Sequence, residues 1–230
     1  VFGHGNGVTQ QFGSGVLFKI ANRHFVLTAA HVVDHGTIHK IPFAISPVKP
    51  GEPPIQLTGV DTGTTPVPSG RKENDPHMRD DDPLDVGFVE LTSEMVARTC
   101  GEARFATLDE VDTTDGLLQG CYLIYGFPCK FSAVNEKTRI AYSQAFRYLT
   151  DLYDEPTDRF DPAAEIRLKY PEVGMTYEQR RIQVPNPKGM SGCGIWRIMD
   201  MKPPSMWTRS DVKLAAIDHM WHGQRRYIQG

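Results

Sequence analysis

The chain has 230 residues, of which 40% are hydrophobic, and its formal net charge is -3 at pH 7. This length and composition predict a globular protein with an ordinary buried core. The basic residues occur only in short pairs such as Arg180-Arg181, and no apolar run approaches the roughly 20 residues that span a bilayer. We therefore expect neither nucleic acid nor a membrane as a partner. Because the chain does not begin with methionine, we expect a processed product or a piece of a longer protein.

Short strands separated by turn-forming residues dominate the pattern of the first half. Residues 11–20 and 23–28 predict a hairpin with its turn at Ala21-Asn22. The second strand leads into residues 28–33, whose two alanines favour one helical turn, so His31 is expected at a strand-to-helix junction. Further strands are expected at residues 37–45, 55–60 and 85–91.

Two polar segments interrupt this pattern. Residues 61–83 contain proline and a charge run, and predict a long surface loop whose charges are mostly solvated. Residues 93–116 have few large apolar side chains and indicate a connection between two halves. We place the linker at residues 99–116, between an N-terminal domain of residues 1–98 and a C-terminal domain of residues 117–230.

The second half again consists of short strands. They are expected at residues 117–127, 138–149, 164–170, 212–220 and 225–229, with a polar insertion at residues 151–162. Many short strands and few helices favour an all-β barrel or sandwich over an α/β sheet.

The four cysteines show neither the spacing of a metal site nor a dense disulfide pattern. They are Cys100, Cys121, Cys129 and Cys193. We expect mostly free thiols, a reducing compartment and a cytoplasmic location, although one bridge between Cys121 and Cys129 is compatible with the sequence.

A serine flanked by glycines is the first candidate for chemistry. Residues 188–194 read Lys-Gly-Met-Ser-Gly-Cys-Gly and precede the apolar pair Ile195-Trp196. Glycine permits backbone geometries in which neighbouring amides converge on one oxygen, as stabilising an oxyanion requires. Ser191 is therefore a candidate nucleophile, and Cys193 is a weaker one. A glycine-rich hairpin without catalytic function is the alternative.

A serine nucleophile needs a base that takes its proton and an acid that orients the base. Among the eight histidines, His31 is the best candidate base because its junction is rigid, while a structural role is the alternative. His31 and His35 also have a spacing that could bind zinc, but no third ligand accompanies them, so we expect no metal.

Asp85 is the candidate orienting acid. It heads the apolar alternation of residues 85–91, and Gly87 leaves room for a neighbouring ring to pack closely. A turn or strand cap is the alternative role for Asp85. The other acids of this region, residues 80–82, lie in the charge run expected to be solvated, where a carboxylate would be too mobile to orient an imidazole.

The order of these motifs resembles that of the chymotrypsin/trypsin-like serine peptidases. The resemblance rests on residues 12–15 and 25–31, which end in Thr-Ala-Ala-His, on residues 85–89, and on residues 189–192. It implies an all-β fold of two six-stranded antiparallel β-barrels with the active site in the cleft between them. His31 and Asp85 would come from the first barrel and Ser191 from the second, with the amides of Gly189 and Ser191 as the oxyanion hole.

Three features depart from the family's pattern. Met190 stands where secreted members often have Asp or Asn, and Cys193 stands where they often have a second glycine. The first residues, Val-Phe-Gly-His, match an activation terminus poorly, so activation by insertion of a new amino terminus is not expected. The family's disulfides have no counterpart, which favours an intracellular or bacterial type.

The resemblance also implies a substrate pocket lined by residues 185–188 and 216–221, with Pro185, Asp218 and His219 as candidates. Asp218 and His219 are adjacent on an expected strand and must face opposite sides. A basic substrate side chain would be favoured if Asp218 faces the pocket, and Glu or Gln if His219 does.

The sequence therefore predicts a serine endopeptidase that acts on a protein or peptide substrate through an acyl-enzyme. It needs no cofactor, and it is expected to be a regulated domain of a larger protein. The alternative is a protease-like binding or scaffold domain that is inactive without a partner. An ester hydrolase of the α/β type is disfavoured, because no long helical pattern follows Ser191.

Overall fold

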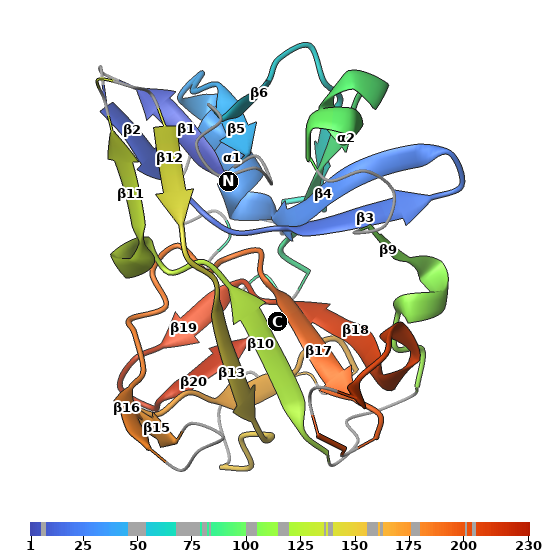
Figure 1. The fold of residues 1–230 in the computed structure, drawn as a ribbon, viewed down its shortest axis with the longest axis vertical. Coiled ribbons are helices and arrows are strands. Elements are labelled where there is room, and N and C mark those ends of the chain that lie inside the picture. The colour runs from blue at the N-terminus through green and yellow to red at the C-terminus, as the bar shows by residue number, and fades with distance from the viewer. Residues whose placement is uncertain are drawn as a thin grey trace.

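The computed structural model describes most of the chain and shows a mostly β fold, as predicted. The described residues are 1–5, 8–45, 54–67, 79, 82, 84–99, 105–114, 120–135, 137, 140–155, 161, 163–175, 180–200, 202–203 and 206–230. Two α-helices occur among them, α1 (Ala30–Ile38) and α2 (Ser93–Thr99). In Figure 1 the elements of the first half lie above those of the second half, except for one hairpin, residues 132–135 and 140–143, which reaches up beside the first two strands of the chain.

Two sheets form the first half. One has the order β7-β8-β4-β3-β9, with β7 (Thr62–Thr64), β8 (Val86–Leu91), β4 (Arg23–Ala29), β3 (Val16–Ile20) and β9 (Ala106–Thr107). The other has the order β2-β1-β5-β6, with β2 (Val8–Gln11), β1 (Phe2–Gly5), β5 (Phe43–Ile45) and β6 (Ile55–Leu57). The predicted hairpin is present as β3 and β4, whereas β9 runs parallel to β3.

Helix α1 is longer than the single turn predicted for residues 28–33. It extends to Ile38, so the strand predicted at residues 37–45 is wrong at its start and is reduced to β5. The buried positions of α1 are Ala30, Val32, Val33 and Gly36, which form one apolar side of the helix. A Cβ atom at Gly36 would lie 2.0 Å from the Phe43 ring, so this glycine lets β5 pack closely on the helix.

The second half contains a four-stranded sheet, a three-stranded sheet and two hairpins. The first sheet has the order β13-β10-β17-β18, with β13 (Phe146–Thr150), β10 (Tyr122–Gly126), β17 (Gly194–Ile198) and β18 (Val212–Ile217). The second has the order β14-β20-β19, with β14 (Arg167–Lys169), β20 (Tyr227–Gln229) and β19 (Met220–His222). The hairpins are β11 (Ser132–Asn135) with β12 (Ile140–Ser143), and β15 (Val173–Met175) with β16 (Arg181–Gln183).

Two of the strands predicted in this half are in fact pairs of strands. The stretch at residues 138–149 contains β12 and β13, and the stretch at residues 212–220 contains β18 and the start of β19. Strands β11, β15, β16 and β17 were not predicted. Most side chains of β11, β15 and β16 are exposed or only partly buried, so apolar alternation is weak there.

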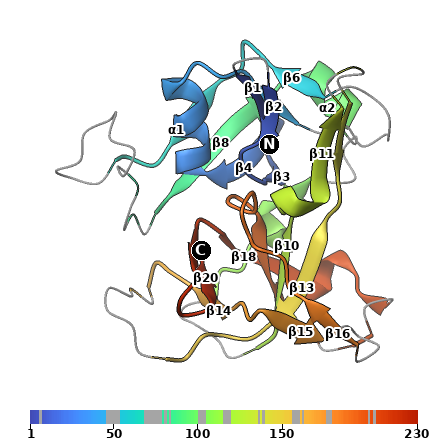
Figure 2. The same cartoon turned by 90° about the vertical axis from the view of Figure 1, so that its left-hand side faces the viewer.

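Apolar contacts join the two halves. Val16 and Phe18 of β3 share a buried cluster with Leu214 and Ile217 of β18. The β11–β12 hairpin rises from the second half beside β1 and β2 (Figures 1 and 2), and its Ala141 packs against Ala44 of β5. The division at residues 1–98, 99–116 and 117–230 and the closure of two six-stranded barrels stay predictions.

Part of the charge run at residues 61–83 is buried, contrary to prediction. Arg79 and Asp82 are only 5% and 3% exposed. The Arg79 guanidinium donates from Nε to Asp34 Oδ2 of α1, at 2.8 Å, and from Nη1 to Asp82 Oδ2, also at 2.8 Å. Residues 80 and 81 lie outside the described part. The charge run was misjudged because a buried ion pair depends on α1, which is distant in the sequence.

Cys121, Cys129 and Cys193 are free thiols, so the bridge between Cys121 and Cys129 does not form, and Cys100 lies outside the described residues. No helix in the described part of the chain is both long and apolar enough to span a membrane.

Arg79→Met tests whether the buried ion pairs stabilise the fold. We expect the free energy of unfolding to fall by about 3 kcal/mol, because the Asp82 carboxylate would remain buried without its partner. Arg23→Met is the matched control, since the pair of Arg23 with Glu90 is largely exposed and screened by solvent, so its loss should cost much less. Urea unfolding measures both, and equal losses would contradict the assignment.

Candidate active site

His31 and Asp85 are hydrogen-bonded to each other. His31 is the second residue of α1, directly after β4, and Asp85 directly precedes β8. The antiparallel pairing of β4 with β8 sets Ala29 opposite Val86 and so brings the two residues together. His31 Nδ1 lies 2.6 Å from Asp85 Oδ2, and the His31 amide donates to Asp85 Oδ1 at 2.8 Å. Two bonds to one carboxylate fix both the helix start and the ring.

The environment of Asp85 favours its charged form. Burial acts to raise the pKa of Asp85, but the hydrogen bonds and charge of His31 outweigh it, so the pKa lies below its ordinary value. An ionised carboxylate only accepts hydrogen bonds, so Nδ1 of His31 carries the proton. Nε2 is then the basic nitrogen of a ring whose side chain is 37% exposed.

Gly87 allows α1 to lie close to β8. A Cβ atom at this position would be 2.9 Å from Val33 Cγ2 and 3.1 Å from the Cα atom of Ala30. The sequence predicted that Gly87 makes room for a ring, but its neighbours are this aliphatic side chain and backbone. The close packing still sets the position of the first turn of α1, which carries His31.

The turn that carries Ser191 is pressed against the end of β4. Gly192 has φ +90°, and a Cβ atom there would lie 2.1 Å from Thr28 Oγ1. The Gly192 amide donates to the Asp218 carbonyl at 2.6 Å, and the Ser14 amide donates to the Ser191 carbonyl at 2.7 Å. Since Thr28 is three residues before His31, the turn brings Ser191 to the region of the His31–Asp85 pair. Within the described residues, Ser191 Oγ has no hydrogen-bond partner.

The amide groups of Gly189 and Ser191 are oriented in the same way, since the carbonyl of the residue before each one accepts a hydrogen bond. The Cys129 amide donates to the Lys188 carbonyl at 2.8 Å, and the Cys193 amide donates to the Met190 carbonyl at 2.7 Å. In a trans peptide the N–H points opposite to the C=O. The N–H of Gly189 therefore points away from Cys129, and the N–H of Ser191 points away from the amide of Cys193. Neither amide donates to any residue that the structure describes. Both N–H groups are therefore donors without a protein acceptor in the described part of the chain.

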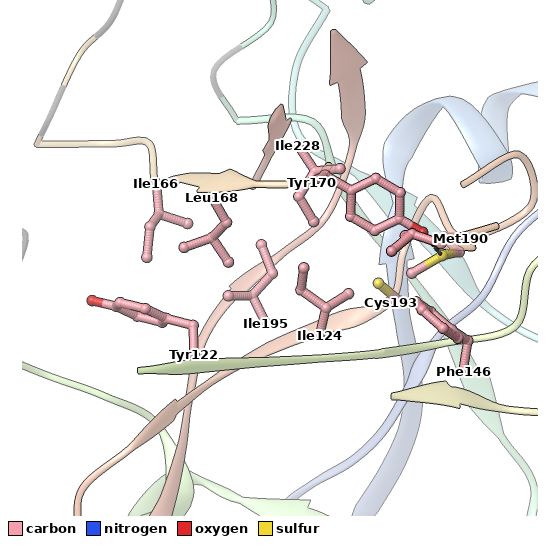
Figure 3. Close-up of a cluster of buried hydrophobic side chains, with 11 residues drawn as sticks. Tyr122, Ile124, Phe146, Ile166, Leu168, Tyr170, Met190, Cys193, Ile195 and Ile228 are labelled. Carbon is pink, nitrogen blue, oxygen red and sulfur yellow. Dashed lines mark hydrogen bonds between the residues drawn. The ribbon is translucent and has the colours of Figure 1, made fainter. Parts of the chain in front are cut away.

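Met190 and Cys193 anchor the serine turn in the core of the second half. Both are completely buried and lie with Tyr170 in the cluster of Figure 3. The Tyr170 hydroxyl lies 3.5 Å from Met190 Sδ and donates to the Pro185 carbonyl at 3.0 Å. Burial raises the pKa of the Cys193 thiol well above its ordinary value, which disfavours Cys193 as a nucleophile.

Asp218 and His219, the two titratable candidates for a pocket, lie outside a strand and approach different groups. They lie between β18 and β19, and both are buried. Asp218 Oδ2 is 3.9 Å from Cys193 Sγ, whereas His219 Nδ1 is 3.9 Å from Asp85 Oδ2. Burial raises the pKa of Asp218 well above, and lowers the pKa of His219 below, their ordinary values. Pro185, the third candidate, is also buried.

Sequence reasoning missed two neighbours of the site. His219 lies against Asp85, and Gln11 donates a hydrogen bond to the Gly189 carbonyl at 2.9 Å. Both contacts join segments far apart in the chain, and no local pattern marks them. The zinc alternative for His31 and His35 finds no support, since no three His, Cys, Asp or Glu side chains in the described part could hold a metal ion together.

Comparisons with known proteins give a fold relationship. No protein-family model matches the chain, and no curated protein matches its sequence. Among solved structures, the fold is similar to that of a Glu endopeptidase in complex with MPD, with a TM-score of 0.50. The similarity covers 95% of this chain and 84% of the other at 10% sequence identity. It supports a protease-like fold that is mostly β.

Gly192→Ala tests the close approach of the serine turn to β4. We expect a loss of unfolding free energy at least about 2 kcal/mol larger than that of Gly59→Ala, because the added Cβ would overlap Thr28. Gly59 is the matched control, with φ +64° and no atom within 4 Å of its added Cβ, so only the backbone strain of about 1 kcal/mol applies there. Equal losses in urea unfolding would contradict the packing.

Asp218→Asn tests the burial of this acid. Because the folded-state pKa of Asp218 is raised, its stability contribution is present below the unfolded pKa of about 4 and is lost as the pH rises. We expect the variant and the parent to be similarly stable below pH ~4, and the variant to become increasingly more stable toward neutral pH. Urea unfolding across this range measures the difference. The exposed Asp200→Asn is the control, and a parallel pH dependence of all three proteins would refute the expectation.

Proposed function

We propose that the protein is a serine endopeptidase in which Ser191 is the nucleophile, His31 the general base and Asp85 the residue that orients His31. The observation that carries the proposal is the 2.6 Å contact of His31 Nδ1 with a buried Asp85, beside a serine turn packed on Thr28. This contact leaves Nε2 as a base on a ring of fixed orientation.

The proposed reaction has two stages. Ser191 Oγ bonds to the substrate carbonyl carbon while His31 Nε2 takes the hydroxyl proton. The C–N bond then breaks, and His31 returns the proton to the leaving amine, which leaves an acyl-enzyme. In the second stage water attacks the ester, with His31 again as base, and the acid product and Ser191 are released.

The amides of Gly189 and Ser191 are proposed to stabilise the oxyanion in both stages. Support comes from the hydrogen bonds to the Lys188 and Met190 carbonyls, which fix the two peptides that carry these amides. Removing one such donor costs about 3 kcal/mol in other enzymes. Because both peptides are held before substrate arrives, little reorganisation would be needed during the reaction.

We propose that the pocket for the substrate side chain lies between residues 185–188 and 216–221. Pro185 and Asp218 belong to the side that faces Tyr170 and Cys193. His219 lies instead against Asp85, so its imidazole is better suited to act on the His31–Asp85 pair than on the substrate. The substrate is a protein or peptide.

Labelling with an alkyl fluorophosphonate tests the proposed function. The parent protein should be labelled, Ser191→Ala should not, and the exposed Ser210→Ala should react like the parent. Asp85→Asn should slow peptide cleavage by about 10⁴-fold, because the wrong imidazole tautomer would face Ser191. Mass spectrometry and initial cleavage rates provide the measurements.

Two outcomes would contradict the proposal. Labelling that survives Ser191→Ala would remove Ser191 as the nucleophile. A folded parent protein that is not labelled at all would favour a binding domain that needs a partner to assemble its site. Circular dichroism of each variant shows whether the fold is intact.

A further inference from the structure

The Gly189 carbonyl accepts two side-chain hydrogen bonds from the first half of the molecule. Gln11 Nε2 and Ser14 Oγ each lie 2.9 Å from this oxygen. Gln11 is the last residue of β2, and Ser14 lies between β2 and β3. Gln11 Nε2 also donates to the carbonyl of Phe127, which follows β10. The loop before Ser191 is thus held across the boundary between the two halves.

Ser14 connects this loop to the strand that leads to His31. Its hydroxyl also accepts from the Phe127 amide at 3.0 Å, and its carbonyl accepts from Thr28 Oγ1 at 2.8 Å. Its amide donates to the Ser191 carbonyl at 2.7 Å. Ser14 is 1% exposed, and all its polar groups have partners. A buried and fully satisfied residue of this kind defines a single arrangement of the chain segments around it.

The peptide groups on either side of Gly189 need such restraint. Gly189 has φ +89°, and glycine adopts positive and negative φ values about equally readily. The backbone of Gly189 therefore does not by itself fix the orientation of the adjoining peptides. Met190 is apolar and cannot hold the loop through an ion pair. The Cys129 amide fixes the peptide before Gly189. In the peptide after it, the Met190 amide donates to the Pro187 carbonyl at 2.7 Å within the loop, and the Gly189 carbonyl accepts from Gln11 and Ser14. Of these bonds to the second peptide, those from Gln11 and Ser14 are the ones that come from outside the loop.

We propose that Gln11 and Ser14 are positioning residues that keep the Gly189 and Ser191 amides in the orientation required for the oxyanion. The proposal rests on the proposed function and extends it to two residues of the first half. Its consequence is that docking of β2 and the β2–β3 segment onto the second half activates the site. The loop then does not need an ion pair from the residue before Ser191, which is the apolar Met190, to hold its orientation.

The kinetics of fluorophosphonate labelling test this proposal. In the labelling step the Ser191 Oγ–P bond forms, fluoride leaves and His31 takes the proton, while the phosphoryl oxygen occupies the oxyanion position. Ser14→Ala and Gln11→Met should each lower the maximal labelling rate by about tenfold, and together by about 100-fold, since small misplacements have effects of this size. The probe concentration for half-maximal rate should stay unchanged, because the amides act in the transition state.

Two variants separate positioning from general stability. Thr150→Val is the matched control, because Thr150 Oγ1 is a buried hydroxyl that donates to the Lys169 carbonyl at 2.7 Å, at the far end of β10 from Phe127. It should label like the parent. Ser14→Thr keeps the donor and should restore most of the rate lost in Ser14→Ala. If Thr150→Val slows labelling as much as Ser14→Ala does, the proposal is wrong.

Amide hydrogen exchange gives a readout that does not require activity. Exchange at residues 188–192 should be faster in Ser14→Ala and Gln11→Met than in Thr150→Val. Parent-like labelling and exchange in both variants would overturn the positioning role while leaving the proposed function intact. A parent protein that is not labelled would overturn the proposed function instead. If, in that case, exchange at residues 188–192 is also unchanged in Ser14→Ala and Gln11→Met, the restraint of the loop by these residues is overturned as well.

Discussion

The packing of the serine turn against the end of β4 is the contact on which the candidate site depends. Gly192 has no side chain, and this allows its Cα atom to approach Thr28 and the Ser14 carbonyl. The same strand continues directly into α1 and His31. One close contact between backbones therefore sets the relation between a residue of the second half and two residues of the first.

The two halves contribute different kinds of rigidity. In the first half, pairing of β4 with β8 and two hydrogen bonds to one carboxylate hold His31 and Asp85. In the second half, completely buried Met190 and Cys193 anchor the turn in an apolar core. Ser14 and Gln11 then connect the turn to the first half through the Gly189 carbonyl. Hydrogen bonds supply direction at the boundary, whereas apolar burial supplies most of the stability on each side.

Among the titratable groups His31, Asp85, Asp218 and His219, only His31 is partly exposed. Asp85, Asp218 and His219 are all buried. Burial raises the pKa of Asp218 and lowers the pKa of His219, and both shifts favour the neutral form of the side chain. Asp85 stays charged because it has His31 as a hydrogen-bond donor. A charged, buried carboxylate hydrogen-bonded to a partly exposed imidazole is the arrangement that makes the imidazole a directed base.

The sequence by itself determined the features that depend on neighbouring residues. The β3–β4 hairpin, the strand-to-helix junction at His31 and the strand headed by Asp85 follow from alternation and turn residues, and the structure contains all three. The tight turn at Ser191 follows from its glycines. The length of α1 and the strands β11, β15, β16 and β17 were missed, because their apolar stretches are short and become recognisable only against their partners.

Only the tertiary structure decided which distant groups meet. Segments distant in the chain meet where His219 approaches Asp85 and where Gln11 and Ser14 bond to Gly189. The burial of Asp82 with Arg79 likewise depends on a distant segment, since Arg79 also bonds to Asp34 of α1. A polar side chain has the same local sequence signal whether it is solvated or paired in the interior. Its partner, and with it the sign of its pKa shift, is set by the packing of the two halves.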